Sequence, residues 1–215
     1  MEKRWRCTVC GYIHTGENPP EICPICGADA SFFELVSQED EAKPSSEVKS
    51  NAKPVVDQPD GEAAIRQALY RISYGLYIIS AQAEGRDNGQ CANTCFQITS
   101  EPARLAIGIN KLNFTHELIQ KSGKFGVSVL SQTGHDYARK FGYRTGRDVN
   151  KFEGVAVHRG KSGVLLLNDV LVTMEATVIS QLDSGTHTLF LADVIGGEIL
   201  QEGEPMTYAY FRAKK

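Results

Sequence analysis

The strongest constraint in this sequence is a pair of Cys-x-x-Cys motifs close to its start. The first is Cys7-Thr8-Val9-Cys10 and the second is Cys23-Pro24-Ile25-Cys26. In each motif a tight turn directs two thiolates toward a common centre. The glycine that follows each pair permits a backbone conformation that other residues resist. Four sulfur ligands at this spacing predict one tetrahedral site for zinc or iron, formed by Cys7, Cys10, Cys23 and Cys26. The alternatives are unligated core cysteines and disulfides, and disulfides are rare in intracellular chains.

Length and charge narrow the class of protein. The chain has 215 residues, 41% of them hydrophobic, and a formal net charge of -3. This length allows one or two domains. Basic and acidic residues are both abundant, so nothing favours nucleic acid or an anionic membrane as a partner. No apolar run is long enough to span a membrane. The start of the chain lacks the apolar core of a signal peptide, so we expect a cytoplasmic protein.

Residues 1–36 are predicted to form a small module around the metal. A unit of this size cannot close an adequate hydrophobic core by itself, so the metal must supply much of its folding energy. Its expected packing residues are aromatic: Trp5, Tyr12, Phe32 and Phe33.

The residues around the cysteines follow a recognisable order, with Trp5-Arg6 before the first pair, then Gly11-Tyr12, His14, Pro20 and Phe32-Phe33-Glu34. In this order, and in the short gap between the pairs, the module resembles the rubredoxin domain of rubrerythrins. The resemblance implies a single iron that cycles between its ferrous and ferric states. Zinc in the same site would be structural, and four thiolates alone do not separate the two metals.

Residues 37–60 differ in composition from what precedes and follows them. They are polar, contain three prolines and several serines, and include no aromatic residue. This composition predicts a flexible linker between two domains, which would keep two sites at high mutual concentration without fixing their orientation.

Residues 61–215 are predicted to form a mainly β domain. Apolar residues recur at helical spacing from Ile65 to Leu76, which predicts a helix that begins after Asp60 and ends near Ser73-Tyr74-Gly75. Strand-like segments and two short helices follow. Because strands and helices do not alternate regularly, a closed barrel is favoured over a doubly wound sheet. The expected strands are 76–81, 91–99, 105–110, 124–130, 171–181 and 186–195, and the expected short helices are 114–121 and 135–141.

Polar residues are unusually frequent in two neighbouring segments. The first is Asn93-Thr94-Cys95, and the second runs from Asn110 to Thr115. Asn113 is a candidate cap for the helix that follows, and free backbone N–H groups, Lys111 and Thr115 would then suit a phosphate. Taken alone, this pattern favours ordinary helix capping beside a surface lysine. A second candidate, Gly160-Lys161-Ser162, is not a P-loop because its preceding glycine stands at the wrong distance.

Residues from about 62 to 211 match a longer ordered pattern. It includes Asn93-Thr94-Cys95-Phe96, the Asn110 to Ile119 segment, Lys151-Phe152-Glu153-Gly154-Val155, and His187 to Val194. In this order the region resembles the flavin reductase family, whose domain is an FMN-binding split β-barrel. The fold class expected for the chain is therefore mainly β: a small metal domain, a linker and a split barrel with short helices.

The family resemblance implies a homodimer with one FMN in each subunit. It places the isoalloxazine ring against Asn93, Thr94 and Cys95, and the flavin phosphate near Asn110, Lys111, Asn113 and Thr115. It assigns His187 to the nicotinamide or the flavin edge, where a satisfied strand histidine is the alternative. Cys95 departs from the family pattern, in which serine is usual.

Two redox modules in one chain suggest electron transfer between them. A flavin accepts two electrons and an iron–tetrathiolate centre handles one, so the pair would convert hydride transfer into single-electron transfer. We therefore predict an NAD(P)H-dependent flavin reductase that reduces its own rubredoxin centre. By resemblance to high-molecular-weight rubredoxins, that centre would serve an acceptor such as a flavodiiron oxygen or nitric oxide reductase. The alternative is a flavoredoxin-like electron carrier that another protein reduces.

Overall fold

The computed structural model describes residues 3–8, 12–23, 29–36 and 61–214. It divides the chain into two compact units, Met1–Asp60 and Gly61–Lys215, which are described separately here. The predicted linker, residues 37–60, lies outside the described residues, as do Cys10 and Cys26.

The first unit is a small antiparallel sheet with strand order β2-β1-β3. Its elements are β1 (Arg4–Cys7), β2 (Ile13–Thr15), the short helix η1 (Ala30–Phe32) and β3 (Phe33–Leu35). The Asp29 side chain caps η1 by accepting a hydrogen bond from the Ser31 amide at 2.9 Å. Phe33 is buried, but the preceding Phe32 is 44% exposed, so the expectation that both phenylalanines pack the module was wrong for Phe32. Phe32 is the last residue of η1, whereas Phe33 begins β3 and belongs to the buried cluster with Cys7 and Cys23.

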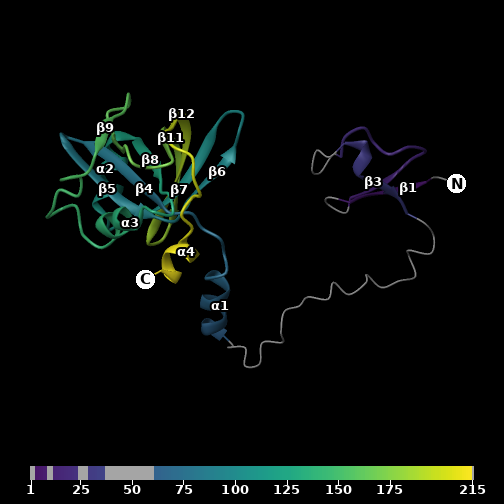
Figure 1. Cartoon of the computed structure of the whole chain (residues 1–215), viewed down its shortest axis with the longest axis horizontal. Coiled ribbons are helices and arrows are strands. Elements are labelled where there is room, and N and C mark those ends of the chain that lie inside the picture. Colours follow the sequence, from purple (N-terminus) through teal and green to yellow (C-terminus); the bar gives the residue numbers. More distant parts are fainter. Residues whose placement is uncertain (1–2, 9–11, 24–28, 37–60, 215) are drawn as a thin grey trace. The chain divides into compact units, whose positions relative to one another are not determined.

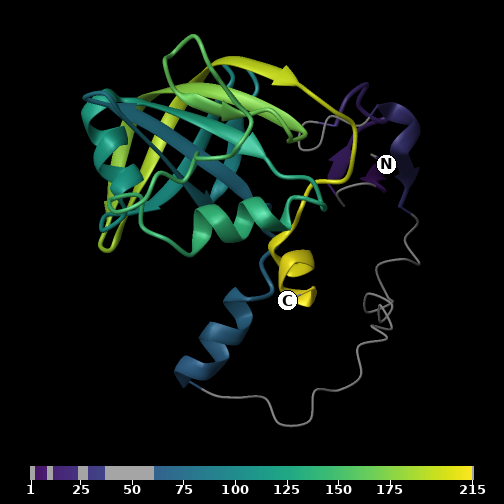
Figure 2. The same cartoon turned by 60° about the vertical axis from the view of Figure 1, so that its left-hand side comes forward.

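The second unit is built on one seven-stranded antiparallel sheet with the order β5-β4-β8-β11-β12-β7-β6. Figures 1 and 2 show these strands curving around a common interior. The predicted mainly β architecture is confirmed. The strands of this sheet are β4 (Tyr77–Ala83), β5 (Arg86–Ala92), β6 (Cys95–Thr99), β7 (Arg104–Asn110), β8 (Lys124–Val129), β11 (Val172–Ser184) and β12 (His187–Ile199). A separate hairpin is formed by β9 (Val157–Arg159) and β10 (Leu165–Leu167).

The single strand predicted over residues 91–99 is instead two strands, β5 and β6. They pair with different partners, β5 with β4 and β6 with β7, and so occupy opposite ends of the strand order. The chain changes partner at Asn93-Thr94, where the Thr94 side chain covers Gly108 of β7. A Cβ on Gly108 would lie 2.9 Å from the Thr94 methyl group, so this crossing requires a glycine beneath it.

Four α-helices accompany the sheet: α1 (Gly61–Leu69), α2 (Phe114–Ser122), α3 (His135–Gly142) and α4 (Tyr208–Ala213). The predicted helices at 114–121 and 135–141 are confirmed. The first helix ends at Leu69, earlier than expected, because the chain beyond it continues in tighter turns such as Ile72 N–H to Leu69 C=O. None of its residues is buried, and α1 projects from the barrel in both views (Figures 1 and 2).

The interior of the second unit consists of two clusters of buried apolar side chains. One lies between the sheet and α2 and is centred on Ile79, Ile107 and Phe125. The other lies beneath α3 and α4 and includes Phe141 and Phe211. Strand β5 borders both helices, α2 and α3. Among the described residues, no helix is both long and apolar enough to cross a membrane.

Candidate functional site

Two of the four predicted metal ligands lie in the described part of the first unit. Cys7 and Cys23 are each only 1% exposed and belong to one buried cluster with Phe33. Trp5 and Tyr12 pack against this cluster, and the Cys7 amide donates a hydrogen bond to the Tyr12 carbonyl at 2.8 Å. Two thiols from distant parts of the sequence therefore meet in one small core, which fits a shared soft metal ion.

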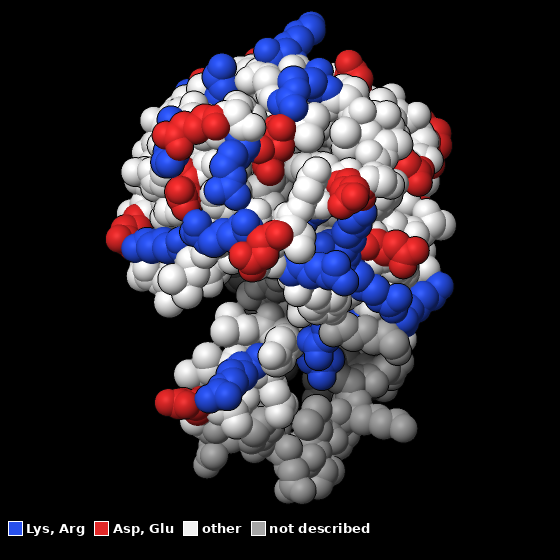
Figure 3. All heavy atoms as spheres, turned by 90° about the vertical axis from the view of Figure 1, so that its left-hand side faces the viewer, with Lys and Arg blue, Asp and Glu red and all other residues white. Residues whose placement is uncertain are grey.

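In the second unit, a cavity of about 310 Å³ lies where β5, the start of α2 and the segment after α3 meet. We call it the polar pocket. Lys151 and Arg144 line it, and none of its lining residues is aspartate or glutamate. The face drawn in Figure 3 as a whole mixes Lys and Arg with Asp and Glu. The lining residues are Asn88, Gln90, Cys91, Leu112, Asn113, Phe114, Thr115, Phe141, Gly142, Tyr143, Arg144, Thr145, Gly146 and Lys151.

Lys151 is the buried cation of the polar pocket, with 6% of its surface exposed. Its Nζ donates hydrogen bonds to the carbonyl oxygens of Gly89 and Phe141, both at 3.0 Å. Phe141 belongs to the last turn of α3, so the lysine satisfies a carbonyl that the helix leaves without a partner. Burial lowers the pKa of Lys151 to about 8, while the nearby Cys91 thiol acts weakly in the opposite direction.

The inner wall of the polar pocket is formed by buried amide and hydroxyl groups. Asn88 Nδ2 donates a hydrogen bond to Thr115 Oγ1 at 2.8 Å, and both side chains are buried. Gly146 closes against this pair, because a Cβ there would lie 1.8 Å from Asn88 Oδ1. Gln90 is 9% exposed, and its Oε1 is buried without a hydrogen-bond partner. A buried acceptor of this kind is costly unless a ligand or water donates to it.

A second cavity, of about 260 Å³, shares Cys91, Gly142 and Tyr143 with the polar pocket. We call it the apolar pocket, since most of its remaining lining is carbon-rich. Burial raises the pKa of the Cys91 thiol to about 12, so Cys91 lines the pocket as an uncharged thiol. The remaining lining residues are Leu76, Ala92, Asn93, Ala138, Tyr208 and Phe211. The two pockets therefore lie beside each other along Cys91, Gly142 and Tyr143.

Apart from Thr94, which covers Gly108, the predicted flavin-site residues fall into four places. Asn113 and Thr115 line the polar pocket, and Asn93 lines the apolar pocket. Asn113 stands at the N-cap position of α2, but its side chain makes no capping hydrogen bond. Cys95 lines neither pocket. It borders a separate cavity of about 330 Å³ beside Tyr77 and Phe96, and burial raises the pKa of its thiol to about 12.

Asn110, Lys111 and His187 form a group of their own at the end of β7 and the start of β12. Asn110 and His187 are register partners across the two strands. The Lys111 amide donates to the Thr186 carbonyl at 3.0 Å, and Lys111 Nζ pairs with Asp183 at 2.6 Å. His187 is exposed, with its Nδ1 lying 2.9 Å from Thr186 Oγ1. None of these three residues lines the polar or the apolar pocket.

His116 belongs to the first turn of α2 and contacts the start of β12. Its Nε2 lies 2.8 Å from Thr188 Oγ1, and its ring packs on Phe190 with centroids 5.5 Å apart. Burial, and then the charge of Lys111, lower the pKa of His116. The imidazole is therefore neutral at physiological pH and serves to hold α2 against β12.

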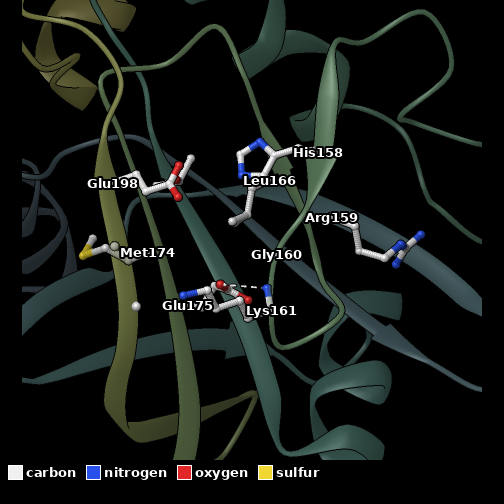
Figure 4. A pocket seen from close by; sticks show the side chains of 11 residues that line it. His158, Arg159, Gly160, Lys161, Leu166, Met174, Glu175 and Glu198 are labelled. Atoms are coloured by element: carbon white, nitrogen blue, oxygen red, sulfur yellow. Dashed lines mark hydrogen bonds between the residues drawn. The ribbon is translucent and has the colours of Figure 1, made fainter.

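The turn at Gly160-Lys161-Ser162 holds one of the protein's own carboxylates. Glu175, 8% exposed, accepts hydrogen bonds from the Lys161 amide at 3.1 Å and the Ser162 amide at 2.7 Å. Figure 4 shows Glu175 and Lys161 at one end of a cavity, with His158 and Glu198 at the other. The backbone amides that could bind an anion at this turn are therefore occupied by the Glu175 carboxylate.

Four polar-pocket residues were not predicted from the sequence: Asn88, Gln90, Arg144 and Lys151. Asn88 and Gln90 lie on β5, most of which falls outside the strands expected from the sequence. The two polar residues are two positions apart, so they share one face of a strand, and this spacing was the signal that could have identified them. Lys151 stood within the segment that carries the family resemblance, but nothing in its local pattern marks a buried lysine.

Comparison with known proteins agrees with this architecture. Residues 69–215 match the model of the family described as flavin reductase like domain, and residues 5–34 match that of the rubrerythrin, rubredoxin-like domain. The ferric-chelate reductase (NAD(P)H) of Archaeoglobus fulgidus is 43% identical over 151 residues, which cover 69% of this chain and 89% of that protein. The high molecular weight rubredoxin of Moorella thermoacetica is also 43% identical over 151 residues, which cover 69% of this chain and 66% of that protein.

Solved structures share the fold of the second unit. The NADH:FAD oxidoreductase of Streptomyces globisporus superimposes with a TM-score of 0.67 at 23% identity, covering 74% of this chain and 96% of that one. The flavin reductase PheA2 gives a TM-score of 0.60 at 24% identity, covering 69% and 93%. Both resemblances predicted from the sequence are confirmed: the chain belongs to the flavin reductase-like domain family and carries a rubredoxin-like domain of the rubrerythrin type in front of it.

Proposed function

We propose that this protein is an NAD(P)H-dependent flavin reductase that passes electrons from FMN to an iron–tetrathiolate centre. From there the electrons would go to an acceptor protein such as a flavodiiron oxygen or nitric oxide reductase. The observation that carries the proposal is the carboxylate-free polar pocket joined to an apolar pocket, in a chain whose other unit is a rubredoxin-like domain. FMN would supply hydride acceptance from NAD(P)H and electron release to the metal.

The two pockets suit the two ends of FMN. Lys151, Arg144 and the start of α2 would hold the phosphate, because a helix N-terminus and two cations without carboxylates in the same pocket favour an anion. Gln90 Oε1 would accept from a ribityl hydroxyl. The ring would lie along Asn93 in the apolar pocket. Thr94, Cys95, Asn110 and Lys111 stay as proposed contacts, although Lys111 would first have to leave Asp183.

His187 is the proposed residue for the nicotinamide side. Its exposed imidazole on β12 is accessible to a second ligand, and Asn110 stands opposite it. If His187 orients the dinucleotide, His187→Ala should raise KM for NADH or NADPH about tenfold and leave the affinity for FMN unchanged. Equal loss of affinity for both ligands would contradict this role.

We also propose that the protein is a homodimer. Large apolar side chains remain exposed on β6, β11 and β12, among them Phe96, Ile98, Leu182 and Ile195. Such side chains are typical of surfaces that a partner covers. Light scattering coupled to size-exclusion chromatography should give a mass near twice the 23.6 kDa of one chain. A monomer at micromolar concentration would contradict the proposal.

Stopped-flow mixing of the FMN-loaded protein with NADH and with NADPH tests the enzymatic activity. We expect the flavin absorbance to bleach much faster than that of free FMN under the same conditions. Bleaching no faster than free FMN would favour the alternative, a flavoredoxin-like carrier that another protein reduces. The same experiment determines which dinucleotide is the donor.

The iron assignment rests on the pairing with a flavin unit, since four thiolates also bind zinc. Metal analysis and the visible spectrum of the anaerobically purified protein separate the two metals. A colourless first unit that contains zinc under these conditions would remove the electron-transfer role of Cys7, Cys10, Cys23 and Cys26 and leave them a structural one.

A further inference from the structure

Lys151 is held in place by protein groups that leave part of its bonding capacity unused. An ammonium group has three hydrogens to donate. Two of them go to the carbonyls of Gly89 and Phe141, which belong to different elements of the unit. Because Lys151 lines the polar pocket, its remaining donor is available to a ligand there. The side chain is therefore fixed in position before any ligand arrives.

The charge of Lys151 has no anionic partner in the polar pocket. Its hydrogen bonds go to neutral carbonyls, and no lining residue is acidic. A buried charge without a counter-charge is costly, and an anionic ligand removes that cost. Arg144 adds a second positive charge to the rim and, within the described part of the chain, forms no ion pair.

An independent feature points to a ligand that also carries hydroxyl groups. Gln90 Oε1 is a buried acceptor without a donor, on a side chain that is more than nine-tenths buried and lines the same pocket. A carbonyl oxygen accepts from a hydroxyl or an N–H, never from a phosphate dianion. The polar pocket therefore fits a ligand that carries both a hydrogen-bond donor and an anionic group, as a sugar-alcohol phosphate does.

We infer that Lys151 makes the protein select flavins that carry a phosphate, so that FMN is held as a resident cofactor and riboflavin is rejected. This inference rests on the proposed function and concerns the same site. Riboflavin has the hydroxyl groups for Gln90 but leaves the buried ammonium without a counter-charge. FMN satisfies both groups, and its phosphate is a dianion above about pH 7.

A purely structural role for Lys151, as a clamp between β5 and the end of α3, makes a different prediction. Loss of a clamp would weaken FMN and riboflavin equally, because both need the same walls. Loss of a phosphate partner weakens FMN alone. The ratio of the two dissociation constants therefore separates the two roles.

The test is a fluorescence titration of the full-length apoprotein with FMN and with riboflavin at pH 7.5. Lys151→Met is compared with Lys124→Met, a matched change of an exposed lysine on β8 that lines neither pocket. We expect the wild type and Lys124→Met to bind FMN more tightly than riboflavin. In Lys151→Met the ratio of the two dissociation constants should fall about 10- to 100-fold, which is the usual effect of losing a hydrogen bond between charged groups. An unchanged ratio in Lys151→Met would overturn the inference.

The wild type alone provides a second test, which remains decisive if Lys151→Met does not fold. The pKa of Lys151 is lowered to about 8, so above that pH the pocket must take up a proton to bind the phosphate. The preference for FMN over riboflavin should therefore fall between pH 8 and 9.5, and a constant ratio would contradict the inference. If neither flavin binds at any pH, the proposed function itself fails. If both bind equally, only the role of Lys151 fails.

Discussion

At the scale of single residues, the candidate site is held together by buried polar pairs that lie far apart in the sequence. Asn88 and Thr115 meet by one hydrogen bond of 2.8 Å between β5 and α2. Thr115 is fully buried and Asn88 is 3% exposed. The pair therefore fixes the start of α2, where the proposed phosphate site lies, against the strand that carries Gln90.

Replacing Thr115 by valine tests this pair without changing the shape of the side chain. Asn88 Nδ2 would lose its acceptor inside the protein, which costs about 1–3 kcal/mol of unfolding free energy. Urea unfolding of the apoprotein measures this loss. Thr177→Val, at a half-buried position on β11, serves as the control and should change stability by less than about 0.5 kcal/mol. Wild-type stability in Thr115→Val would contradict the account of the pair.

The thiols of Cys91 and Cys95 should be unreactive, although Cys91 is partly exposed. Burial raises the pKa of each thiol to about 12, and the thiolate is the reactive species. Alkylation of the native protein with iodoacetamide at pH 8, followed by peptide mass spectrometry, should leave both cysteines unmodified. Their labelling should become complete in urea. Rapid labelling of Cys91 in the native protein would show that its environment stabilises the thiolate.

The sequence singled out Asn113 and Thr115 from a local helix-start pattern, and their contact with a flavin phosphate stays a prediction. Asn113 and Thr115 lie beside each other in the chain, and both line the polar pocket. Lys151, by contrast, is defined by carbonyls of Gly89 and Phe141 that only the tertiary structure brings to it. Periodicity and helix-capping patterns carry no information about such contacts.

At the scale of elements, strands with clear alternation and helices with clear boundaries were predicted to within a few residues. Elements α2 and α3 are examples, as are β7 and β8. The errors occur where long-range pairing decides the structure. Strand β5 pairs with β4 and β6 with β7, so the chain must break between them, and no local signal marks that change of partner. The β9–β10 hairpin and the short α4 were not predicted.

The β9–β10 hairpin depends on Glu175, whose charge should stabilise it in a pH-dependent way. Burial would raise the pKa of Glu175, but hydrogen bonds from Ser162 and Lys161 outweigh burial and lower it. A carboxyl with a lowered pKa in the folded state stabilises the protein above the unfolded pKa of about 4.3. This contribution is lost as the pH falls through the lower pKa of the folded state.

Glu175→Gln should therefore destabilise the protein at pH 7 by about 1–3 kcal/mol, because a charged acceptor is replaced by a neutral one. The difference from the wild type should shrink as the pH falls below about 4, where the wild-type carboxyl also becomes neutral. Thermal unfolding of both proteins from pH 7 to pH 3 measures this. Glu202→Gln, at an exposed position, is the control. A difference that does not depend on pH would contradict the role of the charge.

At the scale of the whole molecule, the chain combines two units that each have a core of their own. The core of the first is very small, with Cys7, Cys23 and Phe33 as its buried apolar members among the described residues. The second has two larger clusters. The folding of the first unit should therefore depend on its metal, whereas that of the second should not.

Cys23→Ser tests this independence. The variant should lose its metal, and residues 1–36 should lose their resistance to protease. The affinity for FMN should not change, and the melting temperature of residues 61–215 should stay within about 2 °C of the wild type. Limited proteolysis and differential scanning calorimetry measure the two effects. Cys91→Ser, in the second unit, is the matched change that should leave the metal content unaltered. A cooperative loss of both units in Cys23→Ser would show that they fold as one.

The central claim is that electrons from NAD(P)H reach the thiolate-bound iron through the flavin of the same protein. It is tested by anaerobic stopped-flow spectroscopy of the iron- and FMN-loaded full-length protein after mixing with a limiting amount of NADH or NADPH. The account predicts that the flavin absorbance falls first and the ferric–thiolate absorbance then falls, at a rate that does not depend on protein concentration. A flavin that becomes and stays reduced while the ferric–thiolate absorbance remains unchanged would contradict it.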